Sequence, residues 1–349
     1  MSESDQESLH LKHTGLSRRD LFRTAGMAAG GAILLGLPKF LGGGVSEAEA
    51  ALAARTLGPT TVALELEGQY ACFVRSAAGG NAFAELLLEN LGPENIQRKR
   101  PGQVRFEDIL IEVPLGEESK LLGGWVADFL TKSSAPRNGA ITYTDFNMNE
   151  FKRLEFSNAV LTEVAFPAAD AAAGKNVALL TLRIAPQSTR LAGPSGKKAQ
   201  GGLGIKQKAV ISGNFRFNVQ GLENACARIS KVQGIAAKRM KAVEAVGQQR
   251  LPEVVLGVLD CSLISVFLPE ADAGPFYAWF DDTILKGKAS GERGGLIEWL
   301  DPTLKNVLVS VQLGGLGIMR YAPEPVKVGA ETQGLVQVDM YCETIDLKL

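Results

Sequence analysis

Hydrophobic and polar side chains alternate in two stretches that lie about 150 residues apart. Residues 62–68 and residues 214–221 both alternate apolar with polar positions, and both end on a glycine. This period of two predicts β-strands with one buried face, and the final glycine predicts a turn. The two stretches therefore open two similar series of elements.

Further apolar runs complete each series. Residues 106–113 and 254–267 are rich in branched side chains and are closed by Pro114 and Pro269, so we expect a strand in each, the second more buried. Later strands are predicted at residues 140–143, 151–156, 160–166 and 177–184 in the first half, and at 296–299, 307–313, 317–321 and 334–341 in the second.

Each series contains one short helical pattern. Residues 121–130 and 276–285 carry apolar side chains at helical spacing around Trp125 and Trp279. We expect these tryptophans to anchor the helix on the sheet, with a binding role as the alternative. Strands, one helix and further strands predict a mainly β chain of two tandem antiparallel β-sandwich or barrel domains, each with one short covering α-helix. Residues 82–90 and 235–246 look helical by composition alone.

The two series share landmarks at nearly constant spacing, which indicates an internal duplication. A shift of 154 matches Ala71-Cys72 with Ala225-Cys226, Gly80 with Gly234, and Trp125 with Trp279; a shift of 156 matches Arg137 with Arg293 and Asp145 with Asp301. We treat these tryptophans, arginines and aspartates as structural anchors. The predicted domains are residues 56–192 and 211–349, joined by a Gly/Lys linker at 193–210.

Residues 1–55 are set apart as a signal and linker. Arg18 and Arg19, followed by Leu21 and Phe22, precede an apolar run at 25–37 and the small-residue site at 48–50. This resembles a twin-arginine export signal, although Phe-Leu is the commoner order. The run is too short and glycine-rich for a stable membrane span. We expect a periplasmic, surface or extracellular protein; the alternative is a disordered arm and a cytoplasmic location.

Composition and side-chain types exclude several function classes. A formal net charge of −1 over 349 residues gives no reason to expect nucleic acid as a partner. Both histidines, His10 and His13, lie in the leader, so a processed chain would lack histidine metal sites and histidine-activated nucleophiles. We therefore predict no cofactor, no metal and no enzyme activity; chemistry by carboxylates alone stays open.

Four cysteines are widely spaced, without a C-x-x-C pair. Export would permit disulfides, with three possible pairings, and the alternative is that the thiols are small buried apolar groups. These residues are Cys72, Cys226, Cys261 and Cys342.

Three further features have two interpretations each. The basic clusters at 98–100 and 238–241 are either a lumen or partner contact or solvated faces balanced by acids. Residues 201–204 after Lys197-Lys198 are either a flexible linker or a phosphate loop, for which the spacing is wrong.

The order of motifs resembles the phage tail tube proteins of contractile tails and contractile injection systems. In the second half the resemblance is carried by residues 215–222 and 229–235, Leu251-Pro252, Trp279, residues 293–297 leading to Asp301, and residues 335–341; in the first half it is carried by Trp125, residues 137–141, and residues 154–159 leading to Pro167. The resemblance implies that residues 82–90 and 235–246 are strands.

The resemblance also implies a structural, non-enzymatic protein that forms six-membered rings and tubes. Since this chain carries two such domains, three chains would supply six, giving a trimer with pseudo-six-fold symmetry. Expected partners are further copies of the chain and components of an injection apparatus or envelope. The alternative is an exported two-domain β-sandwich binding protein with a ligand cleft between the domains.

Overall fold

The computed structural model describes residues 61–90, 97–116, 119–131, 135–198, 210–244, 251, 253–288, 291–325 and 334–348. The described residues belong to one compact unit. The proposed signal residues Arg18, Arg19, Leu21 and Phe22 lie outside the described residues. No described helix is both long and apolar enough to cross a membrane.

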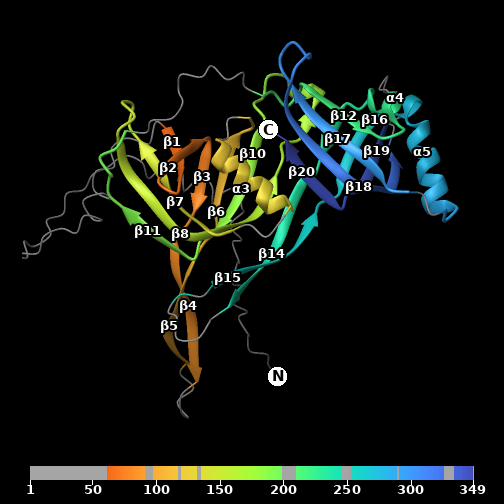
Figure 1. Cartoon of the computed structure of the whole chain (residues 1–349). Helices are drawn as coiled ribbons and strands as arrows, with labels where there is room; N and C mark the ends of the chain where they lie inside the picture. The colour runs from red at the N-terminus through yellow and green to blue at the C-terminus, as the bar shows by residue number, and fades with distance from the viewer. Residues whose placement is uncertain are drawn as a thin grey trace, which may run out of the picture. The chain divides into compact units, whose positions relative to one another are not determined.

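The first copy, residues 61–198, is built mainly from strands (Figure 1). Its elements are β1 Thr61–Leu66, β2 Gln69–Val74, β3 Ser76–Gly79, β4 Ala82–Asn90, β5 Gln97–Phe106, β6 Ile109–Pro114, α3 Lys120–Thr131, β7 Arg137–Thr144, β8 Glu150–Ala165, β9 Ala169–Asp170, the 3-10 turn η1 Ala171–Ala173, β10 Leu179–Ala185 and β11 Ser188–Ala192.

The second copy, residues 210–348, follows a similar course. Its elements are β12 Phe215–Val219, α4 Glu223–Cys226, β13 Lys231–Gln233, β14 Ala236–Glu244, β15 Glu253–Cys261, β16 Ile264–Pro269, the 3-10 turn η2 Glu270–Asp272, α5 Gly274–Phe280, the π-helical turn η3 Asp281–Leu285, β17 Arg293–Leu300, β18 Val307–Pro323, β19 Leu335–Tyr341 and β20 Thr344–Lys348.

Both copies have the same sheet topology. The first orders its strands β1-β7-β8-β10-β6-β3, and the second β12-β17-β18-β19-β16-β13. β11 pairs with β8 as β20 pairs with β18, and each copy has a hairpin, β4–β5 or β14–β15. All pairings are antiparallel, so the predicted mainly β fold with one covering helix in each copy is confirmed. β2 in the first copy and the four-residue α4 in the second are additions.

The turn after β7 and the turn after β17 have the same backbone path. Met148 and Leu304 both have a positive φ, 62° and 58°, and are separated by 156 residues (304 − 148). In each turn the residue with positive φ donates its N–H to the carbonyl of the aspartate three positions earlier, Asp145 or Asp301. Because a non-glycine residue rarely adopts this conformation, its recurrence at the same place marks the duplication in the fold.

Part of the predicted residue-by-residue match between the two copies is wrong. Gly79 ends β3 and Gly234 directly follows the equivalent strand β13, with φ of 88° and 84°. Their positions differ by 155 (234 − 79). A Cβ on either glycine would collide with a backbone carbonyl, that of Asp108 or Leu263. Gly234 therefore matches Gly79, not Gly80. The matched pairs Ala71-Cys72 and Ala225-Cys226 also differ, since the first lies in β2 and the second in α4.

Several element boundaries also depart from the predictions. Residues 82–90 and most of 235–246 are strands, as the family resemblance implies and against their composition. The single buried strand predicted at 254–267 is two strands, β15 and β16, and β15 is largely exposed. Conversely, the strands predicted at 151–156 and 160–166 form one strand, β8, and β18 likewise joins two predictions.

Apolar side chains from both copies form one continuous core. Trp125 on α3 is fully buried and Trp279 on α5 is 4% exposed, so each helix turns its tryptophan toward its sheet. α3 in addition packs against β20 of the second copy.

Candidate assembly interface

The two copies meet through a strand pairing that continues the sheet of the first copy. The start of β14 runs antiparallel to the end of β8, with Ala236 opposite Ala165, Ala237 opposite Val164, and Lys238 opposite Glu163. The hairpin of the second copy is thereby added to the sheet of the first (Figure 1). Ala237 and Val164 are both fully buried.

A second pairing lies beside it. β13, the edge strand of the second copy, pairs with the short β9 of the first, placing Val232 opposite Ala169 and Lys231 opposite Asp170. The Lys231 ammonium lies 3.6 Å from the Asp170 carboxylate. The edge of the second copy's sheet is therefore covered by the first copy, which removes an open edge.

Side chains of β14 hold the first copy at two further points. Arg239 donates to the carbonyl oxygen of Phe129, at the end of α3, over 3.1 Å and 3.3 Å, and its guanidinium lies 5.5 Å from the Phe129 ring centroid. Burial lowers the pKa of Arg239, yet an arginine stays charged. Lys241 forms an ion pair with Asp108 at the start of β6. Part of the basic cluster at 238–241 therefore contacts the first copy.

The equivalents of these surfaces lie on the outer sides of the two copies. Strand registers match β14 with β4 and the end of β8 with residues 320–322 of β18, so Ala82 corresponds to Ala237 and Tyr321 to Val164. Among the described residues β4 pairs only with β5, and residues 320–322 pair only with β19. We call β4 the donor edge, because its equivalent β14 is the strand that is added, and residues 320–322 of β18 the acceptor edge, because the equivalent end of β8 receives it. Among the described residues both edges are open.

Apolar side chains are exposed at both open edges. Phe83, beside Ala82 on β4, is 47% exposed, and Met319, beside the acceptor residues on β18, is 50% exposed. On the acceptor side Tyr277 of α5 is 47% exposed and contacts the ring of Tyr321 edge-on at 5.2 Å. α5 corresponds to α3, which packs against β20. Exposed apolar side chains at open edges are typical of surfaces that bind another chain.

The predicted anchors lie at equivalent places in the two copies. Asp145 Oδ1 accepts from the N–H groups of Asn147 and Asn149, both at 2.8 Å, and Asp301 Oδ1 accepts from those of Thr303, Lys305 and Asn306 at 3.1–3.4 Å. Hydrogen bonds from Thr303 and Asn306 hold the pKa of Asp301 well below its usual range, and a bond from Asn149 lowers that of Asp145.

The arginine anchors begin equivalent strands, β7 and β17. The guanidinium of Arg293 lies 4.9 Å from the centroid of the Trp279 ring and donates to the carbonyl oxygen of Gln220 over 2.7 Å. This cation–π contact ties α5 to the first residue of β17. Asp281 and Asp282, which follow α5, form ion pairs with Lys286.

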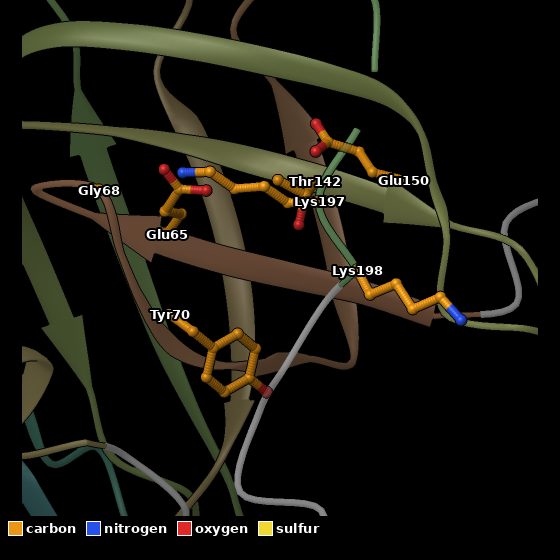
Figure 2. A pocket seen from close by; sticks show the side chains of 7 residues that line it. All are labelled: Glu65, Gly68, Tyr70, Thr142, Glu150, Lys197 and Lys198. Atoms are coloured by element: carbon orange, nitrogen blue, oxygen red, sulfur yellow. The ribbon is translucent and has the colours of Figure 1, made fainter. Parts of the chain in front are cut away.

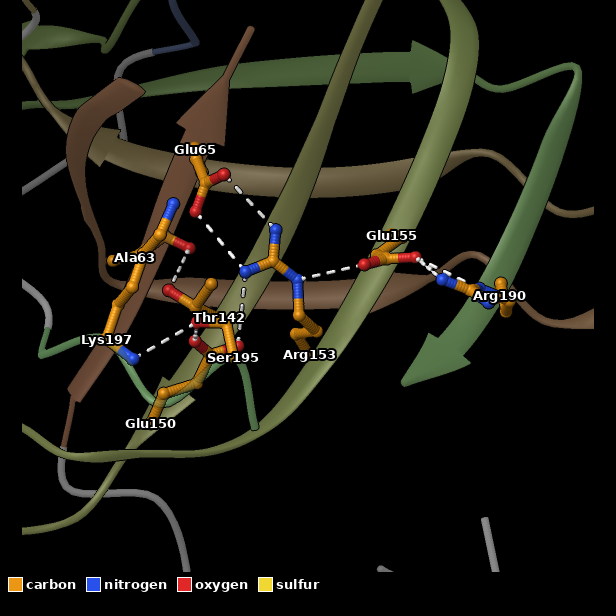
Figure 3. A network of polar contacts seen from close by, with 9 residues as sticks. All are labelled: Ala63, Glu65, Thr142, Glu150, Arg153, Glu155, Arg190, Ser195 and Lys197. Atoms are coloured by element: carbon orange, nitrogen blue, oxygen red, sulfur yellow. Dashed lines mark hydrogen bonds and ion pairs between the residues drawn. The ribbon is translucent and has the colours of Figure 1, made fainter. Parts of the chain in front are cut away.

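A polar cluster that sequence reasoning missed lies on the sheet of the first copy (Figure 3). The guanidinium of Arg153 lies 3.2 Å from Glu65, 3.4 Å from Glu150 and 3.3 Å from Glu155. Glu155 also binds the exposed Arg190, and Ser195 donates to Glu150. Only the alternation of charge along β8 signals this cluster in the sequence. Its other members are distant in the chain: Glu65 on β1 is 88 residues from Arg153, Arg190 on β11 is 35 residues from Glu155, and Ser195 is 45 residues from Glu150.

A cavity of about 310 Å³ borders this cluster. It is lined by Glu65, Gly68, Tyr70, Thr142, Glu150, Lys197 and Lys198, and Figure 2 shows the Lys197 side chain pointing toward Glu65. The carboxylates of Glu65 and Glu150 in this lining both form ion pairs with Arg153. Glu65 and Glu150 therefore share one cation in an ion-pair network.

A second cavity of about 480 Å³ lies beside the same cluster, with Glu65, Arg153 and Arg190 in its lining. The described residues contain no group of three or more His, Cys, Asp or Glu side chains arranged to hold a metal. A cavity lined by both copies has a volume of about 160 Å³, below the roughly 300–1,000 Å³ of usual ligand pockets. Residues 201–204, the glycine loop, lie outside the described residues.

Comparisons with known proteins give structural likenesses only. No family model and no curated protein matches this chain. Among solved structures, the sheath–tube complex of the extracellular contractile injection system PVC in its extended state matches 41% of this chain and 97% of its own, with 16% identity and a TM-score of 0.35. The tube-terminating cap of the anti-feeding prophage matches 40% of this chain and 93% of its own, with 17% identity and a TM-score of 0.35.

A third likeness is to Hcp1 from Flavobacterium johnsoniae, which covers 39% of this chain and 99% of its own, with 18% identity and a TM-score of 0.26. The three solved structures are thus a sheath–tube complex, a tube-terminating cap and an Hcp protein.

Proposed function

We propose that this chain is a structural, non-enzymatic protein that assembles with copies of itself into rings. Three chains would contribute six copies of the fold and form a ring with pseudo-six-fold symmetry. The proposed domains are residues 56–192 and 211–349, joined by a linker. The proposed partners are further copies of the chain and the components of an injection apparatus or envelope layer.

One observation carries this proposal. Inside the chain, β14 of the second copy pairs with β8 of the first, while the equivalent donor β4 and the equivalent acceptor at residues 320–322 have no such partner among the described residues. A contact between different surfaces of equivalent units is head-to-tail, and its repetition gives a closed ring or an open filament. The same pairing between chains would place Ala82 opposite Tyr321 and Phe83 opposite Arg320.

Backbone direction on β4 supports this pairing. The carbonyl of Asn81 accepts from Glu107, across the hairpin, as the equivalent carbonyl of Ala236 accepts from Ser262. Because backbone groups on successive residues point to opposite sides of a strand, the N–H and C=O of Ala82 point away from β5. At the equivalent strand, the carbonyl of Ile235 accepts from Phe166 of the first copy. The counterpart of the Ile235 carbonyl is that of Gly80, which accepts from the Thr189 hydroxyl within the chain, so the proposed pairing rests on the outward N–H and C=O of Ala82.

The test uses a proline that removes only the outward donor. Ala82→Pro deletes an N–H that faces away from β5, so the hairpin should persist while strand addition is blocked. Ala82→Ser keeps the N–H and serves as the matched control. We expect the unchanged chain and Ala82→Ser to form trimers in native mass spectrometry and rings in electron microscopy, and Ala82→Pro to be a folded monomer.

The possible outcomes separate the proposal from the binding-protein alternative. A stable monomer of the unchanged chain at micromolar concentration, seen as dispersed particles, would overturn assembly and favour a binding protein. Assembly of Ala82→Pro to the same extent as the control would show that β4 is not the donor edge. A closed ring with another number of chains would overturn the trimer.

We further propose that the leader directs export by the twin-arginine route, on the strength of Arg18 and Arg19 before the apolar run. Sequencing the amino terminus of the protein from cells tests this. A terminus near residues 48–55 supports export, and an intact residue 1 contradicts it.

A further inference from the structure

Two of the four cysteines lie together where the second copy's hairpin meets its carboxyl-terminal strands. Cys261 is the last residue of β15, and Cys342 directly follows β19. β16 and β19 pair with Ile264 opposite Met340, so continuing this register brings Ser262 opposite Cys342. The thiols of Cys261 and Cys342 are in hydrogen-bonding contact with each other, and the Cys261 thiol donates to the carbonyl oxygen of Glu343 over 3.8 Å.

The surroundings give the two thiols different roles. Cys342 is buried, whereas Cys261 is partly exposed. The hydrogen bond with Cys342 lowers the pKa of the Cys261 thiol, and the same bond together with burial raises the pKa of Cys342. A partly exposed thiol with a lowered pKa is the more reactive of such a pair, and a buried neighbour can resolve it.

We propose that Cys261 and Cys342 are a redox pair that closes to a disulfide when the chain meets an external disulfide. The Cys261 thiolate attacks one sulfur of the external disulfide, forming a mixed disulfide and releasing one thiol. Cys342 then loses its proton and attacks the Cys261 sulfur, and the second external thiol leaves. Two protein thiols are oxidised and one external disulfide is reduced to two thiols, so electrons and protons balance.

The disulfide would join two of the parts of the second copy that contact the first. The β14–β15 hairpin pairs with β8, and β20, which starts two residues after Cys342, packs against α3. The bond would close a loop between residues 81 positions apart (342 − 261). A loop of this size constrains the unfolded chain strongly, so oxidation should raise the thermal midpoint.

The other two cysteines provide an internal control. Cys72 in β2 and Cys226 in α4 are buried in the core, and burial raises the pKa of Cys226 to about 11. Neither should react with an external disulfide while the chain is folded, since the thiolate is the reactive form.

The experiment treats the full-length protein with oxidised glutathione, then denatures it, blocks free thiols with N-ethylmaleimide and maps the peptides by mass. We expect one linkage, between the Cys261 and Cys342 peptides, with Cys72 and Cys226 blocked. Four blocked cysteines, or a linkage involving Cys72 or Cys226, would overturn the proposal. The result is read on one chain, so it is independent of ring formation.

A stability comparison gives a second measurement. We expect the thermal midpoint of the unchanged protein to be higher after oxidation than after reduction, and that of Cys261→Ser to be the same in both conditions. Equal midpoints for the unchanged protein, once the linkage is formed, would contradict a role in holding the hairpin. The peptide map on the unchanged protein stands whether or not the variant folds.

Discussion

Ala237 on β14 lies directly opposite Val164 on β8, and both side chains are fully buried where the two copies meet. At the equivalent place on the outer surface, Ala82 is exposed on β4 and Tyr321 is half-buried on β18. One chain therefore contains the same kind of surface in a covered and an uncovered state. The same substitution can therefore be compared at the covered position, Ala237, and at the uncovered one, Ala82.

Ala237→Asp should destabilise the chain, and Ala82→Asp should not. The first places a carboxylate without a partner in the buried seam between the copies and should lower the free energy of unfolding by about 3 kcal/mol or more. The second places it in water in the isolated chain, where the effect should stay within about 0.5 kcal/mol. Urea unfolding of dilute protein checks the difference.

The proposed ring makes the second half of this comparison informative. If β4 adds to β18 of another chain, Ala82→Asp should abolish trimers while leaving the isolated chain stable. Equal destabilisation by the two substitutions would mean that Ala82 is already buried within one chain, against the described structure.

Asp301→Asn should reduce stability more at neutral pH than in acid. Hydrogen bonds from Thr303 and Asn306 hold the pKa of Asp301 below its unfolded value of about 3.9. A depressed folded pKa stabilises the protein above the unfolded pKa, and this contribution is lost as pH falls through the folded pKa. The difference between unchanged protein and variant should therefore be largest at pH 5–7 and shrink below about pH 4.

Urea midpoints measured from pH 7 to pH 3 check this prediction. Asp145→Asn serves as the parallel variant, because hydrogen bonds from Asn149 also lower the pKa of Asp145 in the equivalent turn. A difference between unchanged protein and Asp301→Asn that stays constant over this range would show that the charge of the carboxylate does not matter to the turn.

Topology could be predicted from the sequence where both copies repeat a local pattern. The alternation at β1 and β12 and the helical spacing around Trp125 and Trp279 are local signals, and the structure has the expected elements there. By contrast, β5 was missed because Pro101 and Gly102 interrupt a polar run. That strand exists through its pairing with β4, a contact that no local pattern records.

The predicted strand boundaries were wrong where the chain passes from one sheet partner to another. Asn158, with a φ of 45°, lies within β8, which pairs with β7 up to Ala159 and with β10 from Val160 onward. The strand predicted at 254–267 is interrupted at Ser262. There the side-chain hydroxyl of Ser262, and not its backbone carbonyl, accepts from the N–H of Ala236. The donor edge and the Arg153 cluster were likewise unpredictable, because both depend on contacts between distant residues.

Trp279→Ala should cost the second copy much of its stability. Trp279 is almost fully buried on α5, and such truncations typically cost about 3–5 kcal/mol. Loss of the contact with Arg293 should add about 0.5–1 kcal/mol. Leu285→Ala, at an exposed position just after the same helix, should change the free energy of unfolding by less than about 0.5 kcal/mol. Chemical unfolding of both variants checks this, and similar losses would contradict an anchoring role for Trp279.

Arg153→Met should expose how the charge cluster of the first copy is balanced. Glu150 is nearly buried and shares Arg153 with Glu65, so removing the guanidinium leaves carboxylates without their cation. Breaking a buried ion pair in this way costs about 3–5 kcal/mol. Arg190→Met is the matched control, because Arg190 is 76% exposed on its side chain and binds only the rim of the cluster at Glu155. Its loss should cost at most about 1 kcal/mol.

A double variant separates charge from packing in this cluster. In Arg153→Met combined with Glu150→Gln, one uncompensated carboxylate becomes a neutral amide of the same shape, so part of the lost stability should return. Differential scanning calorimetry of the unchanged protein, Arg153→Met and the double variant measures how much stability returns. No recovery in the double variant would mean that Arg153 stabilises the sheet through its aliphatic stem and not through its charge.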